Sequence, residues 1–198
     1  KAISDNKLAL TKLTSGELNV YFSLSPKILD QVKIPDNLDL QLSETLIISH
    51  MYFNTSNKLT SNFEFRSDLR ALLSKFADEA LSENNYFVRL NTLIPTGLLQ
   101  NKYYQQTVNK MDLDSFLIKW KNKMKNFKIS VIEEGLPDSF VKRIDILLKI
   151  VKGHLFIVKR KDLVKTLVDQ DYDLIGGRYV GNYPDPDGYL NVMNSAEK

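Results

Sequence analysis

The expected fold is decided by residues 138–170, which read DSFVKRIDILLKIVKGHLFIVKRKDLVKTLVDQ. Asp138 is a good helix N-cap, because its carboxylate can accept hydrogen bonds from the free amides of the first turn. Apolar side chains then recur at the helical period from Phe140 to Val151 and leave only a narrow polar stripe. A helix that is apolar on most sides is expected to lie at the centre of a fold, and Gly153 is expected to end it in the left-handed conformation.

A strand and a second helix are expected to follow. The run His154–Val158 is almost continuously apolar, which is typical of a strand buried on both faces of a sheet. Asp162 is placed to cap the next helix. The apolar side chains of that helix are predicted to be Leu163, Val164, Leu167 and Val168.

The rest of the chain supplies further elements around this centre. Residues 1–16 are polar, and the start of the chain is expected to be poorly ordered. Residues 38–53 are ambiguous, because Ser43 can open a helix while the run Thr45–Phe53 is rich in β-forming residues; the helix is preferred. The other predicted elements are strands at 18–24, 86–94 and 127–132, a short helix at 27–32, and helices at 67–82, 96–111 and 113–124.

The order of these elements predicts the α+β class, with a small sheet and several packed helices in a single compact domain. This domain is expected to span residues 1–175. Residues 176–198 contain Gly, Pro and Asp and are predicted to form a C-terminal tail. The sequence has no cysteine, which excludes disulfides and thiolate metal sites. No apolar run reaches the roughly 18–20 residues of a membrane span.

Charge is distributed unevenly along the chain. The net charge of +3 combines a balance of −1 over residues 1–99, +8 over residues 100–166 and −4 over residues 167–198. A basic middle beside an acidic end is typical of a chain that meets an anionic partner, and equally of a chain whose acidic tail folds back on the basic surface.

Two basic stretches are candidate binding sites. In the first, lysines surround a tryptophan, and such a group suits a nucleic acid, because the lysines contact phosphates and the ring can stack on a base. It would also suit an acidic protein surface or anionic lipid headgroups. In the second, three basic residues and Lys165 lie between a strand and a helix start, where the helix dipole favours anions. Solvated surfaces, with the tryptophan in the core, are the alternative explanation of both. The predicted partner-binding residues are Lys119, Trp120, Lys121, Lys123, Lys125, Lys128, Lys159, Arg160 and Lys161.

The preferred functional hypothesis is a non-enzymatic interaction module, or a subunit of a larger assembly, that binds an acidic protein partner through residues 119–128. The first alternative is a nucleic-acid-binding domain that makes non-specific phosphate contacts. The second alternative is a hydrolase in which the fold brings His50 or His154 to a carboxylate such as Glu133 or Glu134. Catalytic motifs are absent from the sequence, so no catalytic residue is predicted.

No metal and no cofactor is predicted. Asp185, Asp187 and Gly188 resemble half of a calcium loop, but Tyr183 occupies the first ligand position and the bidentate glutamate is missing. A turn formed by the Pro-Asp-Gly sequence explains the same residues without an ion.

Overall fold

A computed structural model describes residues 5–21, 36–39, 41, 47–83, 90 and 109–180. Contacts between Cα atoms divide the chain into two units, Lys1–Glu44 and Thr45–Lys198, and each unit is described by itself. The predicted helices at 27–32 and 96–111 and the predicted strand at 86–94 fall wholly or largely outside the described residues.

The first unit contains helix α1, Asn6–Thr14. The helix starts where it does because the Asp5 carboxylate accepts hydrogen bonds from the amides of Lys7 and Leu8, at 2.9 and 3.2 Å. Within the polar segment 1–16, residues 6–14 thus form a helix, and residues 1–4, at the start of the chain, lie outside the described residues. Residues 18–21, which belong to the predicted strand at 18–24, form no strand.

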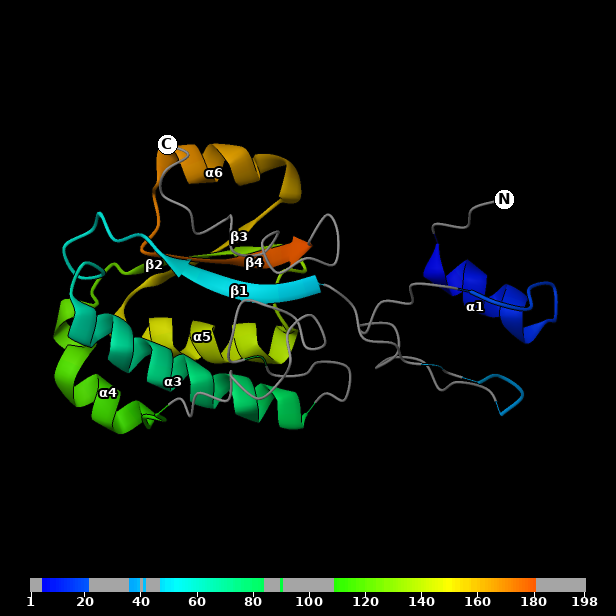
Figure 1. The fold of residues 1–198 in the computed structure, drawn as a ribbon, viewed down its shortest axis with the longest axis horizontal. Coiled ribbons are helices and arrows are strands. Elements are labelled where there is room, and N and C mark those ends of the chain that lie inside the picture. Colours follow the sequence, from blue (N-terminus) through cyan, green and yellow to red (C-terminus); the bar gives the residue numbers. More distant parts are fainter. Residues whose placement is uncertain are drawn as a thin grey trace, which may run out of the picture. The chain divides into compact units, whose positions relative to one another are not determined.

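The second unit is built on a mixed sheet with the strand order β1-β4-β2-β3 (Figure 1). Strand β2 runs parallel to β3 and to β4, whereas β1 is antiparallel to β4. The carboxyl ends of β2, β3 and β4 therefore lie at the same edge of the sheet. The strands are β1 (Ile47–Phe53), β2 (Lys128–Ile132), β3 (His154–Val158) and β4 (Leu174–Val180).

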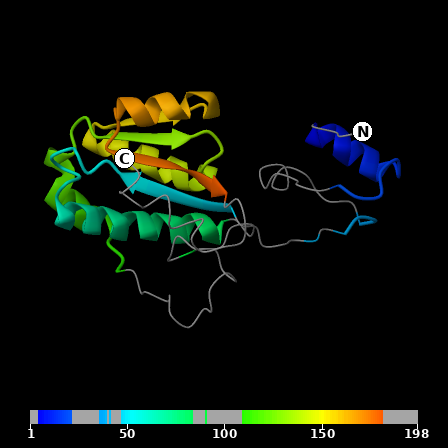
Figure 2. The ribbon, with the colours of Figure 1, turned by 45° about the horizontal axis from the view of Figure 1, so that its top comes forward.

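Helices lie on both faces of the sheet (Figures 1 and 2). One face is covered by α3 (Phe63–Ser82), α4 (Leu113–Trp120) and α5 (Asp138–Val151), and the opposite face carries α6 (Leu163–Asp169). Short 3-10 turns follow α4 at Lys121–Lys123 and precede α6 at Arg160–Asp162.

The hydrophobic core lies between the sheet and the three helices. Its centre is Phe65, whose ring lies 5.1 Å from the ring of Trp120 and 5.5 Å from that of Phe127, both in edge-on geometry. Edge-to-face aromatic pairs of this kind contribute about 0.5–1.5 kcal/mol beyond their burial. Ile129 and Val131 point from β2 into the same core, because alternate side chains of a strand share one face.

Two side-chain caps set the starts of α3 and α4. The amide oxygen of Asn62 accepts from the Phe65 backbone at 3.0 Å, so α3 begins four residues before the predicted Ser67. The Asp112 carboxylate accepts from the Ser115 backbone at 2.8 Å, which confirms the predicted start of α4.

A polar contact ties the end of β1 to the segment that enters β4. The side-chain nitrogen of Asn54 donates to the backbone oxygens of Gln170 and Tyr172, at 3.1 and 3.0 Å. Asn54 is only 9% exposed. The backbone amide of Asn54 donates in turn to the Asp173 oxygen at 2.9 Å. These bonds hold together segments that are more than 110 residues apart.

The central stretch folds largely as predicted. Helix α5 and strand β3 follow in the expected order, with Pro137 rather than Asp138 at the N-cap. The left-handed residue at the end of α5 is Lys152, with φ of 59°, and not Gly153. Gly153 is needed for close approach, since a Cβ there would lie 2.6 Å from the Phe127 backbone oxygen.

Two other predictions in this unit are wrong. Residues 47–53 form strand β1 and not a helix, because pairing with β4 satisfies their backbone and the β-forming side chains suit it. Strand β3 is not buried on both faces: it lies at the edge of the sheet, with Phe156 45% and Ile157 57% exposed.

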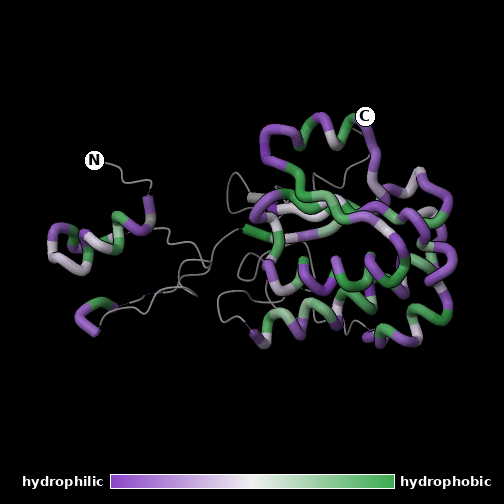
Figure 3. The backbone as a smooth tube through the Cα atoms, turned by 180° about the vertical axis from the view of Figure 1, so that it is seen from behind, coloured by the Kyte–Doolittle hydropathy of each residue, from purple (hydrophilic) through white to green (hydrophobic). Residues whose placement is uncertain are grey.

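The apolar side chains of α6 also differ from the prediction. Val164 is 71% and Val168 74% exposed, so both side chains point to solvent. Figure 3 colours the backbone by hydropathy and shows both hydrophilic and hydrophobic positions in the part of the chain that carries α6. Asp162 makes no side-chain cap to the helix.

The predicted α+β class is confirmed, with a small sheet and several packed helices. Gly176 and Gly177 belong to strand β4, although the sequence assigns them to a tail. The division of the chain at residue 175 stays a prediction. Among the described residues, no helix has both the length and the apolar character that crossing a membrane requires.

Candidate ligand-binding pocket

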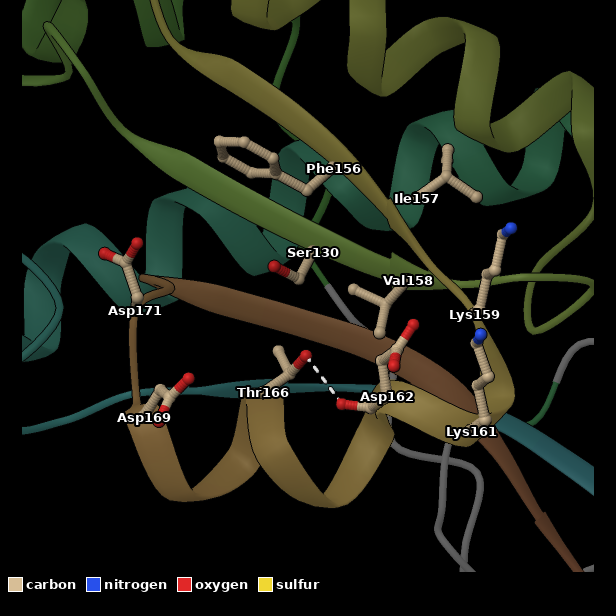
Figure 4. Close-up of a pocket in the computed structure, with 10 residues that line it drawn as sticks. All are labelled: Ser130, Phe156, Ile157, Val158, Lys159, Lys161, Asp162, Thr166, Asp169 and Asp171. Carbon is tan, nitrogen blue, oxygen red and sulfur yellow. Dashed lines mark hydrogen bonds between the residues drawn. The ribbon is translucent and has the colours of Figure 1, made fainter.

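A pocket of about 490 Å³ lies between α6 and the sheet (Figure 4). This volume falls within the range of about 300–1,000 Å³ that is usual for small-molecule sites. The pocket is lined by Ser130, Phe156, Ile157, Val158, Lys159, Lys161, Asp162, Thr166, Asp169 and Asp171.

The floor of the pocket comes from β2 and β3. Ser130 is opposite Phe156 in the parallel register, so their side chains share the sheet face that carries α6. Val158 lies two residues further along β3 on the same face, whereas Ile157 points away from α6 (Figure 4). The floor thus combines an apolar surface with the buried Ser130 hydroxyl, and Phe156 remains 45% exposed.

Helix α6 forms the opposite wall. Its first turn is fixed by the Thr166 hydroxyl, which donates to the Asp162 backbone oxygen at 3.0 Å. The 3-10 turn that precedes it carries Lys161 and brings that side chain to the same end of the pocket as Lys159 (Figure 4). Since α6 has only seven residues, its dipole adds little to anion binding at this end.

The charges of the pocket are separated along its length. Lys159 and Lys161 lie at one end, and Asp169 and Asp171 lie at the other (Figure 4). Asp171 also forms an ion pair with Lys128. The pocket can therefore receive a ligand that has an apolar middle and opposite charges at its two ends.

In the first basic stretch, Trp120 and Lys119 do not lie free at the surface for a partner. Trp120 is 2% exposed and its indole N–H donates to the Asp68 carboxylate at 2.8 Å, so its ring cannot stack on a partner. Lys119 forms ion pairs with Glu64 and Asp68, at 2.6 and 2.7 Å. Partial burial alone would raise the pKa of Asp68, but the hydrogen bonds from Lys119 and Trp120 outweigh it and hold that pKa below its usual range.

The nine predicted partner-binding residues do not form one surface. Lys128 starts β2 and Lys159 follows β3. Because these strands are parallel, Lys128 lies at the amino ends of the strands and Lys159 lies at their carboxyl ends. Lys159 and Lys161 line the pocket. Exposed side chains are found at Lys121, Lys123, Lys125 and Arg160. Their role in binding stays a prediction.

The two histidines lie outside the lining of this pocket. His50 is on β1, its ring is 4.3 Å from that of Tyr52, and burial lowers its pKa to about 4. It is therefore neutral at pH 7. His154 is exposed at the first position of β3, and Glu133 and Glu134 are exposed in the turn after β2.

No group of three or more His, Cys, Asp or Glu side chains that could hold a metal ion occurs among the residues that the structure describes. The calcium-like residues Asp185, Asp187 and Gly188 lie outside the described residues.

Sequence reasoning missed most of the pocket. The acidic end, Asp169 and Asp171, follows the last turn of α6 and looks in the sequence like an ordinary polar connection. Ser130 offered a signal, since it is a single hydroxyl at the centre of the apolar strand FKISVI, and it is 3% exposed. The partner strand and the helix above it can be identified only in three dimensions.

No protein-family model matches the chain, and no curated protein does. Solved structures do match. The substrate-binding protein CtaP of an ABC transporter from Listeria monocytogenes gives a TM-score of 0.77 at 16% identity, over 99% of this chain and 42% of that one. The periplasmic binding protein DppA from Helicobacter pylori, in complex with the peptide STSA, gives 0.67 at 17% identity over 96% and 38%. NikA from Brucella suis, in complex with Fe(III)-EDTA, gives 0.69 at 16% identity over 98% and 43%.

These matches correct the predicted function and partners. CtaP and DppA are binding proteins of ABC transporters, DppA holds a peptide and NikA holds a metal chelate, and these ligands are neither acidic proteins nor nucleic acids. The interaction module for an acidic protein, the nucleic-acid-binding domain and the hydrolase are therefore abandoned. The chain spans about two-fifths of the length of each of these structures. Over that length it shares the fold of these three structures.

Proposed function

We propose that this chain binds a solute, with short peptides as the first class, as part of a substrate-binding protein of an ABC transporter. The observation that carries the proposal is the extent of the structural match: 96–99% of this chain is covered in the structures described above, with TM-scores of 0.67–0.77. A match over nearly the whole chain reflects a shared arrangement of elements rather than one common motif.

The topology of the sheet supports a binding role. Strand β2 is followed by α5 on one face of the sheet, and β3 is followed by α6 on the other face (Figure 1). In open sheets of this kind, ligands bind outside the carboxyl ends of the strands, where successive connections leave for opposite faces. The basic end of the pocket, at Lys159 and Lys161, lies at this edge.

Peptides suit the pocket better than metal chelates do. A peptide has an ammonium group, a carboxylate and apolar side chains, and the pocket offers carboxylates, ammonium groups and the exposed ring of Phe156. A chelate such as Fe(III)-EDTA carries carboxylates on all sides, and the two aspartates at the acidic end would oppose it.

The proposal is tested by thermal unfolding of the full chain with a panel of ligands. The panel contains pools of di-, tri- and tetrapeptides, Fe(III)-EDTA, single-stranded RNA and the same amino acids in free form. A ligand that binds only the folded state at 100 times its Kd stabilises it by about 2.7 kcal/mol, which for a chain of this size raises Tm by roughly 2–4 °C per kcal/mol.

A rise in Tm with a peptide pool, and none with free amino acids or RNA, is the expected result. If RNA raises Tm and no peptide pool does, the proposal is overturned. A rise with Fe(III)-EDTA alone would keep the solute-binding role and replace peptides by chelates.

A further inference from the structure

We infer that the pocket beneath α6 holds a short peptide in extended form, with its carboxylate between Lys159 and Lys161 and its ammonium group beside Asp169. This inference rests on the proposed function and adds to it a site, a ligand length and an orientation. The site is built from side chains of strands β2 and β3, of helix α6 and of the segments that flank this helix, all of which the structure describes.

Each end of the pocket retains about one unit of net charge that a ligand can neutralise, negative at one end and positive at the other. At the acidic end, Asp171 is paired with Lys128, so among the described residues that line the pocket Asp169 is the carboxylate that remains for a ligand ammonium group. At the basic end, the positive charges of Lys159 and Lys161 are offset in part by Asp162. A zwitterion with one charge at each end satisfies both, whereas an anion or a cation satisfies only one.

The length of the pocket suits a peptide of about three residues. From Asp162, next to Lys161, to Asp169 the chain rises by about 10 Å, at 1.5 Å for each helical residue. An extended tripeptide spans about 10 Å, at 3.3–3.4 Å for each residue. Free amino acids are too short to reach both ends, and long peptides would have to leave one end of the pocket.

The floor offers contacts for the middle of such a peptide. Phe156 lies on β3 at the edge of the sheet with 45% of its surface exposed, and Ser130 stands opposite it. An aromatic ring left this exposed on a sheet face is available to a ligand side chain. The outer edge of β3 pairs with no strand among the described residues, so its backbone can also bind an extended chain, as peptides do when they add a strand to a sheet.

The test combines blocked ligands with single variants of the full chain. The ligand is the tripeptide Ala-Leu-Ala, in free, N-acetylated, C-amidated and doubly blocked forms. The variants are Lys161→Met at the basic end and Asp169→Asn at the acidic end. Matched controls are Lys165→Met, which lies on α6 outside the lining residues, and Asp145→Asn on α5, on the other face of the sheet.

Each variant should lose affinity only for ligands that carry the matching charge. Asp169→Asn should weaken the free peptide roughly fivefold and leave the N-acetylated form unchanged, and Lys161→Met should do the same with the C-amidated form as the insensitive ligand. The two controls should bind all four ligands as the unaltered chain does. Circular dichroism and Tm verify that every variant is folded.

Two results would overturn the inference, and they differ in what else they affect. If the unaltered chain binds Ala-Leu-Ala but neither variant responds to the blocking groups, the site is wrong and the proposed function stands. If a folded chain binds neither Ala-Leu-Ala nor any peptide pool, the site and the function both fail.

Discussion

At the scale of single residues, the structure depends on polar groups whose importance the sequence hides. Asn54 looks like the start of a glycosylation sequon, yet it is 9% exposed and its amide nitrogen donates to two backbone oxygens. Asp68 looks like an ordinary first-turn carboxylate, but it accepts from both Lys119 and Trp120. The hydrogen-bond partners of Asn54 and of Asp68 are all more than 50 residues away along the chain, so no local pattern could reveal them.

His50 makes the stability of the fold depend on pH. Burial lowers its pKa to about 4 from an ordinary value of 6.5. As pH falls, His50 is therefore protonated at a higher pH in the unfolded chain than in the folded chain. Acid favours unfolding over the pH range between the two pKa values. We expect the free energy of unfolding to fall by up to about 3 kcal/mol from this residue as pH drops from 6.5 to 4.

Urea unfolding at several pH values measures this effect. His50→Gln should remove that part of the pH dependence, whereas His154→Gln, at an exposed position, should retain it. An unchanged pH profile in His50→Gln would show that the acid sensitivity arises elsewhere.

At the scale of elements, the sequence predicts helices and strands well where the pattern is local. The period of α5, the strand β2 and the start of α4 at Leu113 are confirmed, because each depends on neighbours along the chain. The helix preferred for the ambiguous stretch 38–53 is wrong at residues 47–53, because that segment is set by pairing with β4, more than 120 residues later. The edge position of β3 and the orientation of α6 likewise depend on which elements stand beside them.

Mutations at exposed positions of α6 should affect stability much less than a mutation at a buried position of α5. Val164 and Val168 are 71% and 74% exposed, so Val164→Lys and Val168→Lys are expected to change the free energy of unfolding by no more than about 0.5 kcal/mol. Ile144 on α5 is 0% exposed, and Ile144→Ala is expected to cost about 2–5 kcal/mol. Chemical denaturation compares the three variants. A loss above 2 kcal/mol in either valine variant would show that this face of α6 is covered in solution.

At the scale of the whole molecule, composition gave the wrong partner. The basic middle of the sequence suggested one anionic surface, but the fold pairs Lys119 with two carboxylates and places Lys128 and Lys159 at opposite edges of the sheet. Two of the predicted residues, Lys159 and Lys161, do line the candidate pocket. The acidic end that completes it could not be inferred, because it needs the crossing of α6 over the sheet.

The most direct test of the proposed function is isothermal titration calorimetry of the full chain with the tripeptide Ala-Leu-Ala at pH 7. Saturable binding with one peptide per chain, and a negative heat-capacity change from the burial of apolar surface, is the predicted result. A correctly folded chain that gives no saturable heat with this tripeptide or with the peptide pools would contradict the assignment of this chain to peptide binding.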